Sequence, residues 1–364
     1  MDNSAILKSK KIRLHLTNIA GVGAVKLLES ILPALINQSS YELEEIYLPI
    51  KDRFLATQNF SKETKLTYYK RFLPNSISRF LECTIFGSKF NGESPLLVFG
   101  DMPIRCEAKQ TVFLQNTLLL PGDVYIKGMN IFKYWISRWV FRNNLKYVDR
   151  FIVQSESIRS SLVSNYPEFL DRVDVIPQPV PEWLLKSGVK RKKFINSNES
   201  GLRLFYPAAF YPHKNHKILS AIDHLKSWPV AEIILTIPEN SIVLQEPSFI
   251  KCTGLLTEDL VVETYSKTDG LLFLSVTESY GFPLLEAMWL GLPIICCDLD
   301  YARALCGDEA IYFEHNNLDS LHKAICDLDN KLKQGWWPNW DSQLSEIPIN
   351  WEIVADSMLN SASS

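Results

Sequence analysis

The sequence has little cysteine, no excess of charge of one sign and no long uninterrupted apolar run. Its seven cysteines are scattered, without a C-x-x-C pair, which excludes a disulfide framework and a zinc module. No window approaches the roughly 18 apolar residues of a spanning helix, and the first residues lack the apolar core of a secretory signal. The 38 Lys and Arg residues nearly balance 41 Asp and Glu residues, so the overall charge does not favour a nucleic-acid partner. We therefore predict a soluble, reduced, cytoplasmic protein.

The second half of the chain alternates short, wholly apolar segments with segments of helical length. Apolar strands of this kind belong to sheets that are covered on both faces, and strand–helix alternation is typical of a parallel, doubly wound α/β domain. The predicted strands are 202–209, 231–237, 270–276, 292–297 and 310–314, and the predicted helices are 214–226, 257–267, 283–291 and 317–333.

The first half has a weaker version of the same alternation, and we assign nothing over residues 41–92. A strand at 11–20 precedes a helix at 24–35, and further strands are predicted at 95–100, 111–115, 150–155 and 172–177. Residues 186–201 are polar and basic, as an exposed linker is. We predict two Rossmann-like parallel-sheet domains, 1–185 and 202–340, facing a central cleft in which ligands meet the carboxyl ends of the strands.

The segment from Thr277 to Met288 carries the clearest functional pattern. An apolar strand leads into a polar turn with a glycine, and a proline then opens a helix, whose N-terminus is suited to phosphate. The alternative is a helix-start acid with an unrelated loop charge. Because two carboxylates flank the turn, we predict a donor-binding site formed by Glu278, Gly281, Phe282, Pro283, Leu284 and Glu286, with free N–H groups at Gly281, Phe282 and Leu284.

This E-x7-E segment, together with Y-S-K-T-D-G at 265–270 and G-L-P-I-I at 291–295, resembles that of retaining glycosyltransferases of family 4, which have the GT-B fold. The resemblance covers most of residues 150–360 and is loose over 1–150. It implies that Glu286 holds the ribose of a nucleotide, and that Glu278 and the turn contact the donor sugar and its diphosphate. It also implies a last segment, 341–364, that crosses back to the first domain as a helix.

A lysine in the loop after strand 202–209 is the predicted partner of the diphosphate, because an ammonium group is a compact cation. The resemblance implies that Lys214 neutralises the leaving phosphate, and it places Ala209 where the family has an arginine. His213 or an arginine of the first half is the alternative cation. His213 and His216 have the spacing of metal ligands, but no third ligand follows nearby, so we expect neither a metal nor another cofactor.

Further candidates lie in the first half. The resemblance places the glycine turn of residues 18–24, with Gly23, beside donor and acceptor, where glycine allows close approach of a ligand. The family often has a histidine where this chain has Gln115 and Asn116, so no base is assigned there, and Asp101 is either an acceptor-side group or a turn residue. We expect His15 to be a packed core histidine.

Residues 131–142 have helical periodicity, with aromatic and cationic side chains. Two interpretations are open: a helix lying in a membrane interface, or a domain helix whose aromatic face packs in the core. We favour the core helix. The basic run 190–193 could add attraction to anionic lipids or be only solvated.

The resemblance implies a retaining, metal-independent hexosyltransferase that uses a nucleotide diphosphate-sugar. With the amphipathic pattern of 131–142, it also implies a lipid-linked glycan acceptor, as in O-antigen or capsule biosynthesis. By the resemblance, the leaving phosphate accepts the proton of the acceptor hydroxyl. The alternatives are a sugar-nucleotide epimerase on the same fold, and an inactive scaffold of a polysaccharide assembly complex, which Ala209 and the missing histidine favour.

Overall fold

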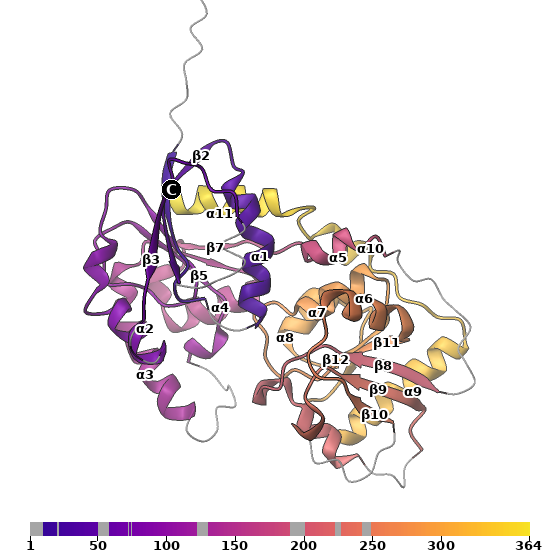
Figure 1. Ribbon diagram of the computed structural model, residues 1–364. Coiled ribbons are helices and arrows are strands. Elements are labelled where there is room, and N and C mark those ends of the chain that lie inside the picture. The colour runs from indigo at the N-terminus through magenta and orange to yellow at the C-terminus, as the bar shows by residue number, and fades with distance from the viewer. Residues whose placement is uncertain are drawn as a thin grey trace, which may run out of the picture. The chain divides into compact units, whose positions relative to one another are not determined.

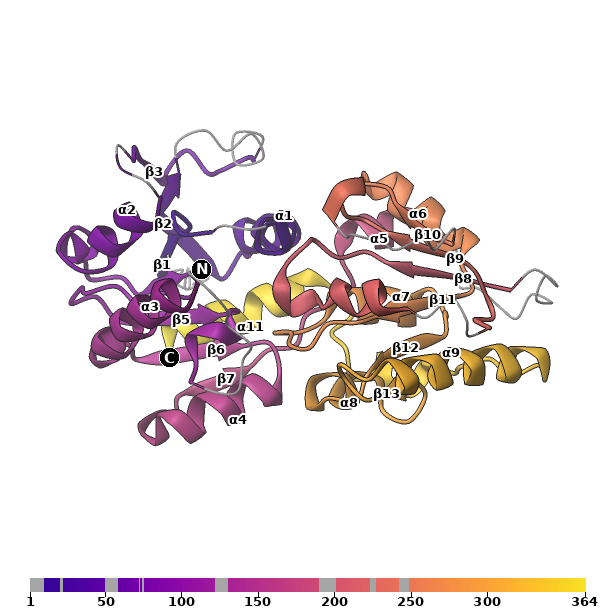
Figure 2. The same ribbon diagram turned by 90° about the horizontal axis from the view of Figure 1, so that it is seen from below.

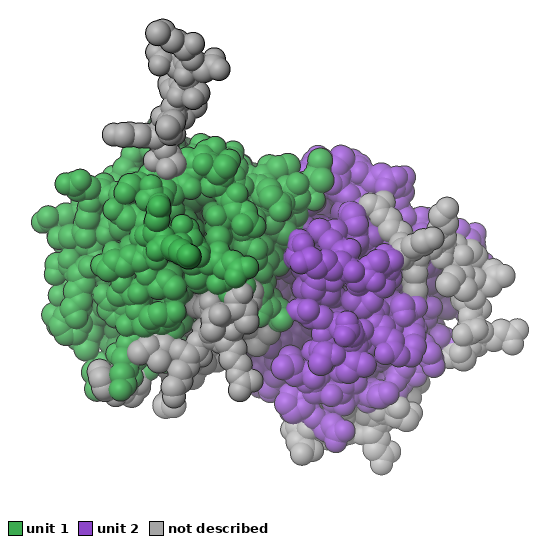
Figure 3. Space-filling model, turned by 45° about the horizontal axis from the view of Figure 1, so that its top comes forward, with its two compact units in different colours: residues 1–179, 348–364 green, residues 180–347 purple. Residues whose placement is uncertain are grey.

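The computed structural model describes residues 10–19, 22–49, 58–71, 73, 75–121, 130–189, 201–222, 227–241 and 249–364. The chain forms two compact units, and each is described by itself. Unit 1 comprises residues 1–179 and 348–364, and unit 2 comprises residues 180–347 (Figure 3).

The described part of unit 1 contains a seven-stranded sheet in which every neighbouring pair is parallel. The strand order is β3-β2-β1-β4-β5-β6-β7, and Figure 1 labels β2, β3, β5 and β7 of this sheet. The strands are β1 (Lys10–His15), β2 (Tyr41–Pro49), β3 (Lys65–Tyr69), β4 (Leu96–Val98), β5 (Gln110–Leu114), β6 (Arg150–Val153) and β7 (Val173–Val175).

Helices cover both faces of this sheet, because successive strand residues point to opposite sides. On one face, side chains of β4, β5 and β6 share a core with α2 (Asn75–Cys83), α3 (Asn130–Asn144) and α4 (Glu156–Asn165). The helices α1 (Val22–Ile36) and α11 (Trp351–Ser363) contact each other, and α11 also contacts β1, β4, β5 and β6. The Tyr41 hydroxyl donates a hydrogen bond to Asn360 Oδ1 and joins β2 to α11.

The described part of unit 2 contains a six-stranded parallel sheet of order β10-β9-β8-β11-β12-β13. Figure 2 shows α6 and α9 on opposite faces of this sheet. The strands are β8 (Leu202–Tyr206), β9 (Val230–Leu235), β10 (Ile250–Cys252), β11 (Gly270–Phe273), β12 (Ile294–Cys297) and β13 (Ile311–Phe313). The helices are α5 (Glu182–Lys186), α6 (Glu258–Lys267), α7 (Phe282–Trp289), α8 (Asp300–Cys306), α9 (Leu318–Lys333) and α10 (Asp341–Ser345).

The division between the units differs from the predicted boundaries. Unit 2 begins at Val180 rather than beyond a linker at 186–201, because Val180 and Leu184 are buried in its core. At the other end, α10 stays in unit 2, and the chain returns to unit 1 only at Pro348. Residues 190–200 of the predicted linker, with the basic run 190–193, lie outside the described residues.

The prediction of an α-helix over residues 214–226 is wrong for the part of this segment that the structure describes. The described part of it forms two short 3₁₀ helices, η6 (Pro212–Lys214) and η7 (His216–Ala221). Asn215 between them has a φ of 54°, and this left-handed residue interrupts the helical path. In the unassigned region 41–92 the structure contains β2, β3 and α2.

None of the helices in the described ranges combines the length and apolar character needed to cross a membrane.

Candidate active site

The site of unit 2 is built on two neighbouring strands, β8 and β11. These strands are paired in parallel, with Leu204 opposite Gly270, so the loops that follow them leave the sheet at the same edge. The His213 carbonyl accepts hydrogen bonds from the N–H of Val276, at 2.8 Å, and from the hydroxyl of Ser275, at 3.3 Å. These bonds tie the two loops together and fix the backbone beside Lys214.

Lys214 and Glu278 form an ion pair between the two loops. Both side chains are largely buried, with 15% and 11% of their surfaces exposed. The Tyr206 hydroxyl donates a 2.9 Å hydrogen bond to the Lys214 carbonyl, and Lys214 Nζ lies 5.9 Å from the centre of the Phe273 ring. The structure thus brings together two of the predicted residues, one cation and one carboxylate, in a setting where charges interact more strongly than in bulk water.

His213 lies next to Lys214, and its ring is stacked on that of Tyr211 with centroids 5.6 Å apart. Burial lowers the pKa of His213 below its ordinary value of 6.5, and the charge of Lys214 lowers it further. The lowered pKa favours the neutral imidazole, so His213 does not supply the cation that the family resemblance expects at position 209. His216 is fully buried, and burial lowers its pKa to about 4.

The turn before α7 has two open N–H groups and one that is occupied. Gly281 has a φ of 90°, and its carbonyl accepts a 2.9 Å hydrogen bond from the N–H of Leu284. The prediction of a free N–H at Leu284 is therefore wrong. Pro283 has no N–H to donate. Among the described residues, no acceptor contacts the N–H groups of Gly281 and Phe282, so these two are the donors that a ligand could meet.

Glu286 lies beyond the first turn of α7 and is buried, with 8% of its surface exposed. Its Oε2 accepts a 2.8 Å hydrogen bond from the Tyr265 hydroxyl. Burial raises the pKa of Glu286 to about 7, against the opposing effect of the Tyr265 hydrogen bond. This environment disfavours the interpretation of Glu286 as a solvated acid at a helix start, and it leaves a carboxyl group with acceptor capacity for a ligand hydroxyl.

Sequence reasoning missed the residues that hold the site in place. Tyr265 is the first residue of the segment 265–270 discussed above. No pattern in that segment predicts that its hydroxyl bonds to Glu286, which lies 21 positions later in the sequence. Tyr301 on α8 likewise donates a 2.6 Å hydrogen bond to the Ser275 carbonyl and supports the loop after β11. Both are aromatic residues with a polar end, which commonly find a hydrogen-bond partner when buried.

Gly281→Ala is expected to reduce the free energy of unfolding by about 1–2 kcal/mol, since a side chain is strained in the left-handed region. A methyl group there would also lie 3.2 Å from Leu284 Cδ1 and press on the turn. Urea unfolding and nucleotide-sugar titration measure the two effects. Gly335→Ala is the matched control, because Gly335 has a φ of 82° with no atom within 4 Å of the added methyl group. Equal loss of ligand affinity in both variants would contradict a role for the turn in binding.

The predicted acceptor-side residues of unit 1 are joined by one carboxylate. Asp101 Oδ1 accepts hydrogen bonds from the N–H groups of Gln115, at 2.6 Å, and Asn116, at 2.9 Å. Asp101 has a φ of 73°, and burial raises its pKa. The Asn116 side chain accepts a hydrogen bond from the N–H of Leu118. Asp101 therefore acts as a turn residue that links the loops after β4 and β5, which is one of its two predicted roles.

Gly23 is the second residue of α1, and an added Cβ there would meet no atom within 4 Å. The described fold thus gives no steric reason for glycine at this position, so the predicted ligand contact stays a prediction. Its neighbour Gly21 lies outside the described residues.

His15 is buried at the end of β1, as expected, and belongs to a hydrogen-bonded cluster that the sequence did not predict. Its Nε2 lies 3.0 Å from Glu82 Oε1 and 2.9 Å from the Thr17 hydroxyl, and Arg71 contacts Glu82 Oε2 at 2.9 Å. Burial alone would raise the pKa of Glu82, but the bonds from His15, Thr17 and Arg71 bring it to about 2. The cluster fixes the segment after β1, because Arg71 also donates to Asn18 Oδ1.

The spacing of His213 and His216 raised the question of a metal. In the part of the chain that the structure describes, no group of three His, Cys, Asp or Glu side chains is arranged to hold an ion.

Sequence comparison places the site inside a known domain. Residues 206–330, about a third of the 364-residue chain, match the family described as Glycosyl transferases group 1. The chain is 21% identical over 248 residues to the O-antigen chain mannosyltransferase RfbU of Salmonella typhimurium, with 64% of this chain and 67% of RfbU covered. It is 28% identical over 96 residues to the serotype-specific mannosyltransferase WbdA of Escherichia coli, of which the match spans only 11%. The chain thus contains a glycosyltransferase group 1 domain.

Comparison with solved structures identifies the fold. Sucrose-phosphate synthase from Thermosynechococcus elongatus has a TM-score of 0.64 at 12% identity, covering 97% of this chain and 98% of that one. HepE from Anabaena, solved in complex with UDP-glucose, has a TM-score of 0.61 at 13% identity, covering 97% and 99%. WaaG, a glycosyltransferase involved in lipopolysaccharide biosynthesis, has a TM-score of 0.59 at 12% identity, covering 95% and 99%. The fold is α/β with two Rossmann-like parallel-sheet units, as in GT-B glycosyltransferases.

Proposed function

We propose that this protein is a retaining glycosyltransferase that transfers a hexose from a nucleoside diphosphate-sugar to a glycan acceptor in surface polysaccharide biosynthesis. The glycosyltransferase group 1 domain and the similarity to O-antigen mannosyltransferases support the general activity. The E-x7-E segment supports retention of configuration, through the resemblance to family 4. The function of a fold must be argued from its site, and the site supplies the main support.

The observation that carries the proposal is the buried ion pair of Lys214 and Glu278 beside the open N–H groups of Gly281 and Phe282. A nucleoside diphosphate-sugar carries a diphosphate next to a hydroxyl-rich sugar. Lys214 and the two N–H groups suit the diphosphate, and the carboxylate of Glu278 suits the sugar hydroxyls. Glu286 suits the ribose, because its buried carboxyl group keeps an acceptor oxygen for a hydroxyl.

In the proposed reaction, the acceptor oxygen bonds to the anomeric carbon while the bond between that carbon and the diphosphate breaks, and negative charge grows on the leaving oxygens. Fixed positive groups at that position lower the barrier, because they need no reorganisation when the charge develops. Lys214 and the N–H groups of Gly281 and Phe282 take this role without a metal ion. The proton of the acceptor hydroxyl passes to the leaving phosphate, so no protein base is assigned.

For the substrates, we propose a mannose-type donor and a lipid-linked glycan acceptor. RfbU and WbdA are named as mannosyltransferases that act on O-antigen or serotype-specific chains. HepE was instead solved with UDP-glucose, so the mannose-type donor is proposed from RfbU and WbdA alone. A lipid-linked acceptor places the reaction at the cytoplasmic face of a membrane.

The test is a calorimetric titration of the full chain with nucleoside diphosphate-mannose and diphosphate-glucose donors, followed by product analysis with and without EDTA. We expect micromolar to millimolar binding of one donor, in the usual range for enzyme substrates, slow donor hydrolysis with retained anomeric configuration, and no effect of EDTA. Loss of turnover that Mg²⁺ restores would contradict the metal-free mechanism. An epimerised donor would indicate the epimerase, and binding without any turnover would indicate the scaffold.

A further inference from the structure

The helix α3 exposes its aromatic side chains, contrary to the interpretation favoured from the sequence. The exposed fractions are 66% for Phe132, 63% for Trp135 and 49% for Trp139. The core of unit 1 instead contains Val140 and Phe141, and the partly buried Ile136 packs against it between them and the aromatic stripe. The periodicity correctly indicated a helix with an aromatic side. Exposing these aromatic side chains to water costs free energy, so a partner surface that covers them is expected.

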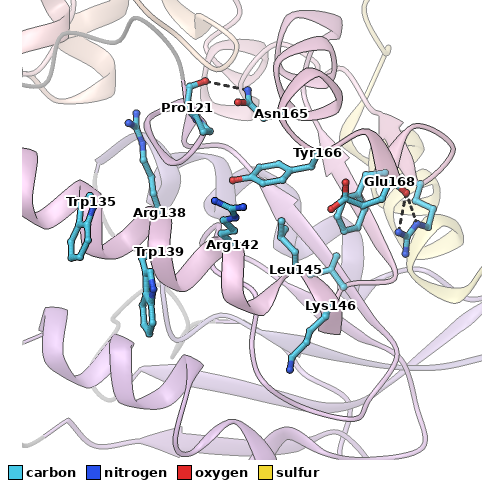
Figure 4. Close-up of a pocket in the computed structure, with 13 residues that line it drawn as sticks. Pro121, Trp135, Arg138, Trp139, Arg142, Leu145, Lys146, Asn165, Tyr166 and Glu168 are labelled. Carbon is cyan, nitrogen blue, oxygen red and sulfur yellow. Dashed lines mark hydrogen bonds between the residues drawn. The ribbon is translucent and has the colours of Figure 1, made fainter.

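Cations lie beside this stripe. At about 100° per residue, Arg138 and Arg142 fall within roughly 60° of Trp135 around the helix axis. Figure 4 shows the side chains of Trp135 and Trp139 on one side of α3, while those of Arg138 and Arg142 extend to the other side, Arg142 toward Tyr166. An exposed helical arc with indoles and guanidinium groups has the composition of an interfacial helix.

The cations and aromatics also line a cavity of about 960 Å³ between α3, α4 and the segment after α4. Its wall contains one acidic side chain, Glu168, and four positive side chains: Arg138, Arg142, Lys146 and Arg172. Among the described residues no carboxylate lies within ion-pair distance of any of the four. The described residues of its wall therefore carry a net positive charge.

Arg138, which lines this cavity, has one N–H donor without a partner. The Nε of Arg138 donates a 2.9 Å hydrogen bond to the Leu118 carbonyl, whereas its Nη2 is buried and contacts no acceptor in the structure. Arg172 makes two hydrogen bonds to the Glu168 carbonyl, which hold its guanidinium over the Phe169 ring. A fixed guanidinium group with an unused N–H is suited to a phosphate oxygen.

We propose that α3 docks this protein on an anionic lipid bilayer, with Phe132, Trp135 and Trp139 in the interface and a lipid phosphate in the cavity beside Arg138 and Arg142. The charge of the cavity selects the bilayer surface over a second copy of this chain, whose own α3 would bring further cations to the contact. The apolar stripe selects it over free phosphate, which gives the aromatic side chains nothing to contact. The inference does not depend on sugar transfer.

The experiment is sedimentation of the full chain with vesicles of phosphatidylcholine alone or mixed with phosphatidylglycerol, at low and high salt. We expect binding to the anionic vesicles, and weaker binding at high salt. Arg142→Ala combined with Lys146→Ala, two exposed side chains, should lower the affinity roughly 25-fold, at about fivefold for each lost charge. Phe132→Ser combined with Trp135→Ser should lower it at least about tenfold.

The controls are Lys323→Ala and Leu255→Ser, an exposed cation and an exposed apolar residue of unit 2, which should leave vesicle binding unchanged. Equal binding to both kinds of vesicle, or equal losses in the controls, overturns the proposal. The proposal is also overturned if inorganic pyrophosphate raises the melting temperature of the protein while the vesicles do not bind it. That result would assign the cavity to a free phosphate. A concentration-dependent dimer that the Phe132 and Trp135 changes abolish would assign α3 to a second copy. Donor hydrolysis in solution stays intact in every variant, so failure here is distinct from failure of the proposed activity.

Discussion

Replacing Lys214 by alanine is expected to lower kcat for sugar transfer by about 10²–10³-fold, the usual effect of removing one preorganised group that stabilises developing charge. Its ammonium group is the one cation that the described residues place against Glu278, and His213 favours its neutral form because burial lowers its pKa. Steady-state kinetics with saturating acceptor measure the effect, which should fall mainly on kcat rather than on KM.

Lys217→Ala is the matched control, because this lysine lies three residues away and is exposed. Lys214→Ala also leaves the Glu278 carboxylate unpaired in a largely buried position, which costs stability. The double variant Lys214→Ala/Glu278→Gln removes that carboxylate charge, so it should regain melting temperature without regaining kcat. Recovery of both together would mean that Lys214 only supports the fold.

The second expected result concerns the buried carboxyl group of α7. Glu286→Gln should stabilise the protein at pH 8 by about 3 kcal/mol and should at the same time weaken donor binding. The pKa of Glu286 is raised by burial from 4.5 to about 7 in the folded protein. Between these two values the folded state keeps a proton that the unfolded state has lost, so the free energy of unfolding falls as the pH rises from about 4.5 to 7. A shift of this size corresponds to about 3 kcal/mol.

Glutamine keeps the shape of the side chain and its acceptor oxygen for Tyr265 but has no charge to desolvate. Urea unfolding at pH 4.5, 6 and 8 should therefore give a steeper pH dependence for the natural protein than for Glu286→Gln. Glu263→Gln on α6 is the control, because Glu263 is exposed and pairs only with Lys267. An unchanged pH dependence in Glu286→Gln would show that burial does not penalise the charge, and unchanged donor affinity would remove Glu286 from the binding site.

The architecture of unit 2 was predictable because the wholly apolar sequences of its strands indicate burial on both faces of the sheet. The strands β11 and β12 are apolar at every position and fully buried, and this pattern is specific to sheets covered on both sides. The strand β2 was missed because Glu42, Glu44 and Glu45 interrupt its apolar positions, and these acids lie on the less buried side of the strand. The edge strand β3 is only partly buried, so its sequence carries no burial signal.

The site was predictable in its residue types but not in its contacts. The turn with Gly281 and Pro283 could be predicted because proline and glycine restrict the backbone locally. The hydrogen bond from Tyr265 to Glu286 depends on how α6 packs beside α7, which no local pattern encodes. The orientation of α3 could not be predicted either, because the helix has two apolar sides. Only the tertiary packing determines that Val140 and Phe141 face the core.

The return of the chain to unit 1 has a consequence for biosynthesis. Unit 2 is continuous from Val180 to Ile347, whereas α11 belongs to unit 1 and follows it. On the ribosome, unit 2 is therefore complete before α1 meets α11, and the Tyr41 to Asn360 hydrogen bond closes a loop of 319 residues. Since domains generally fold as units during synthesis, the side of α1 that contacts α11 stays uncovered until α11 has been synthesised. Unit 1 is thus expected to complete its fold after unit 2.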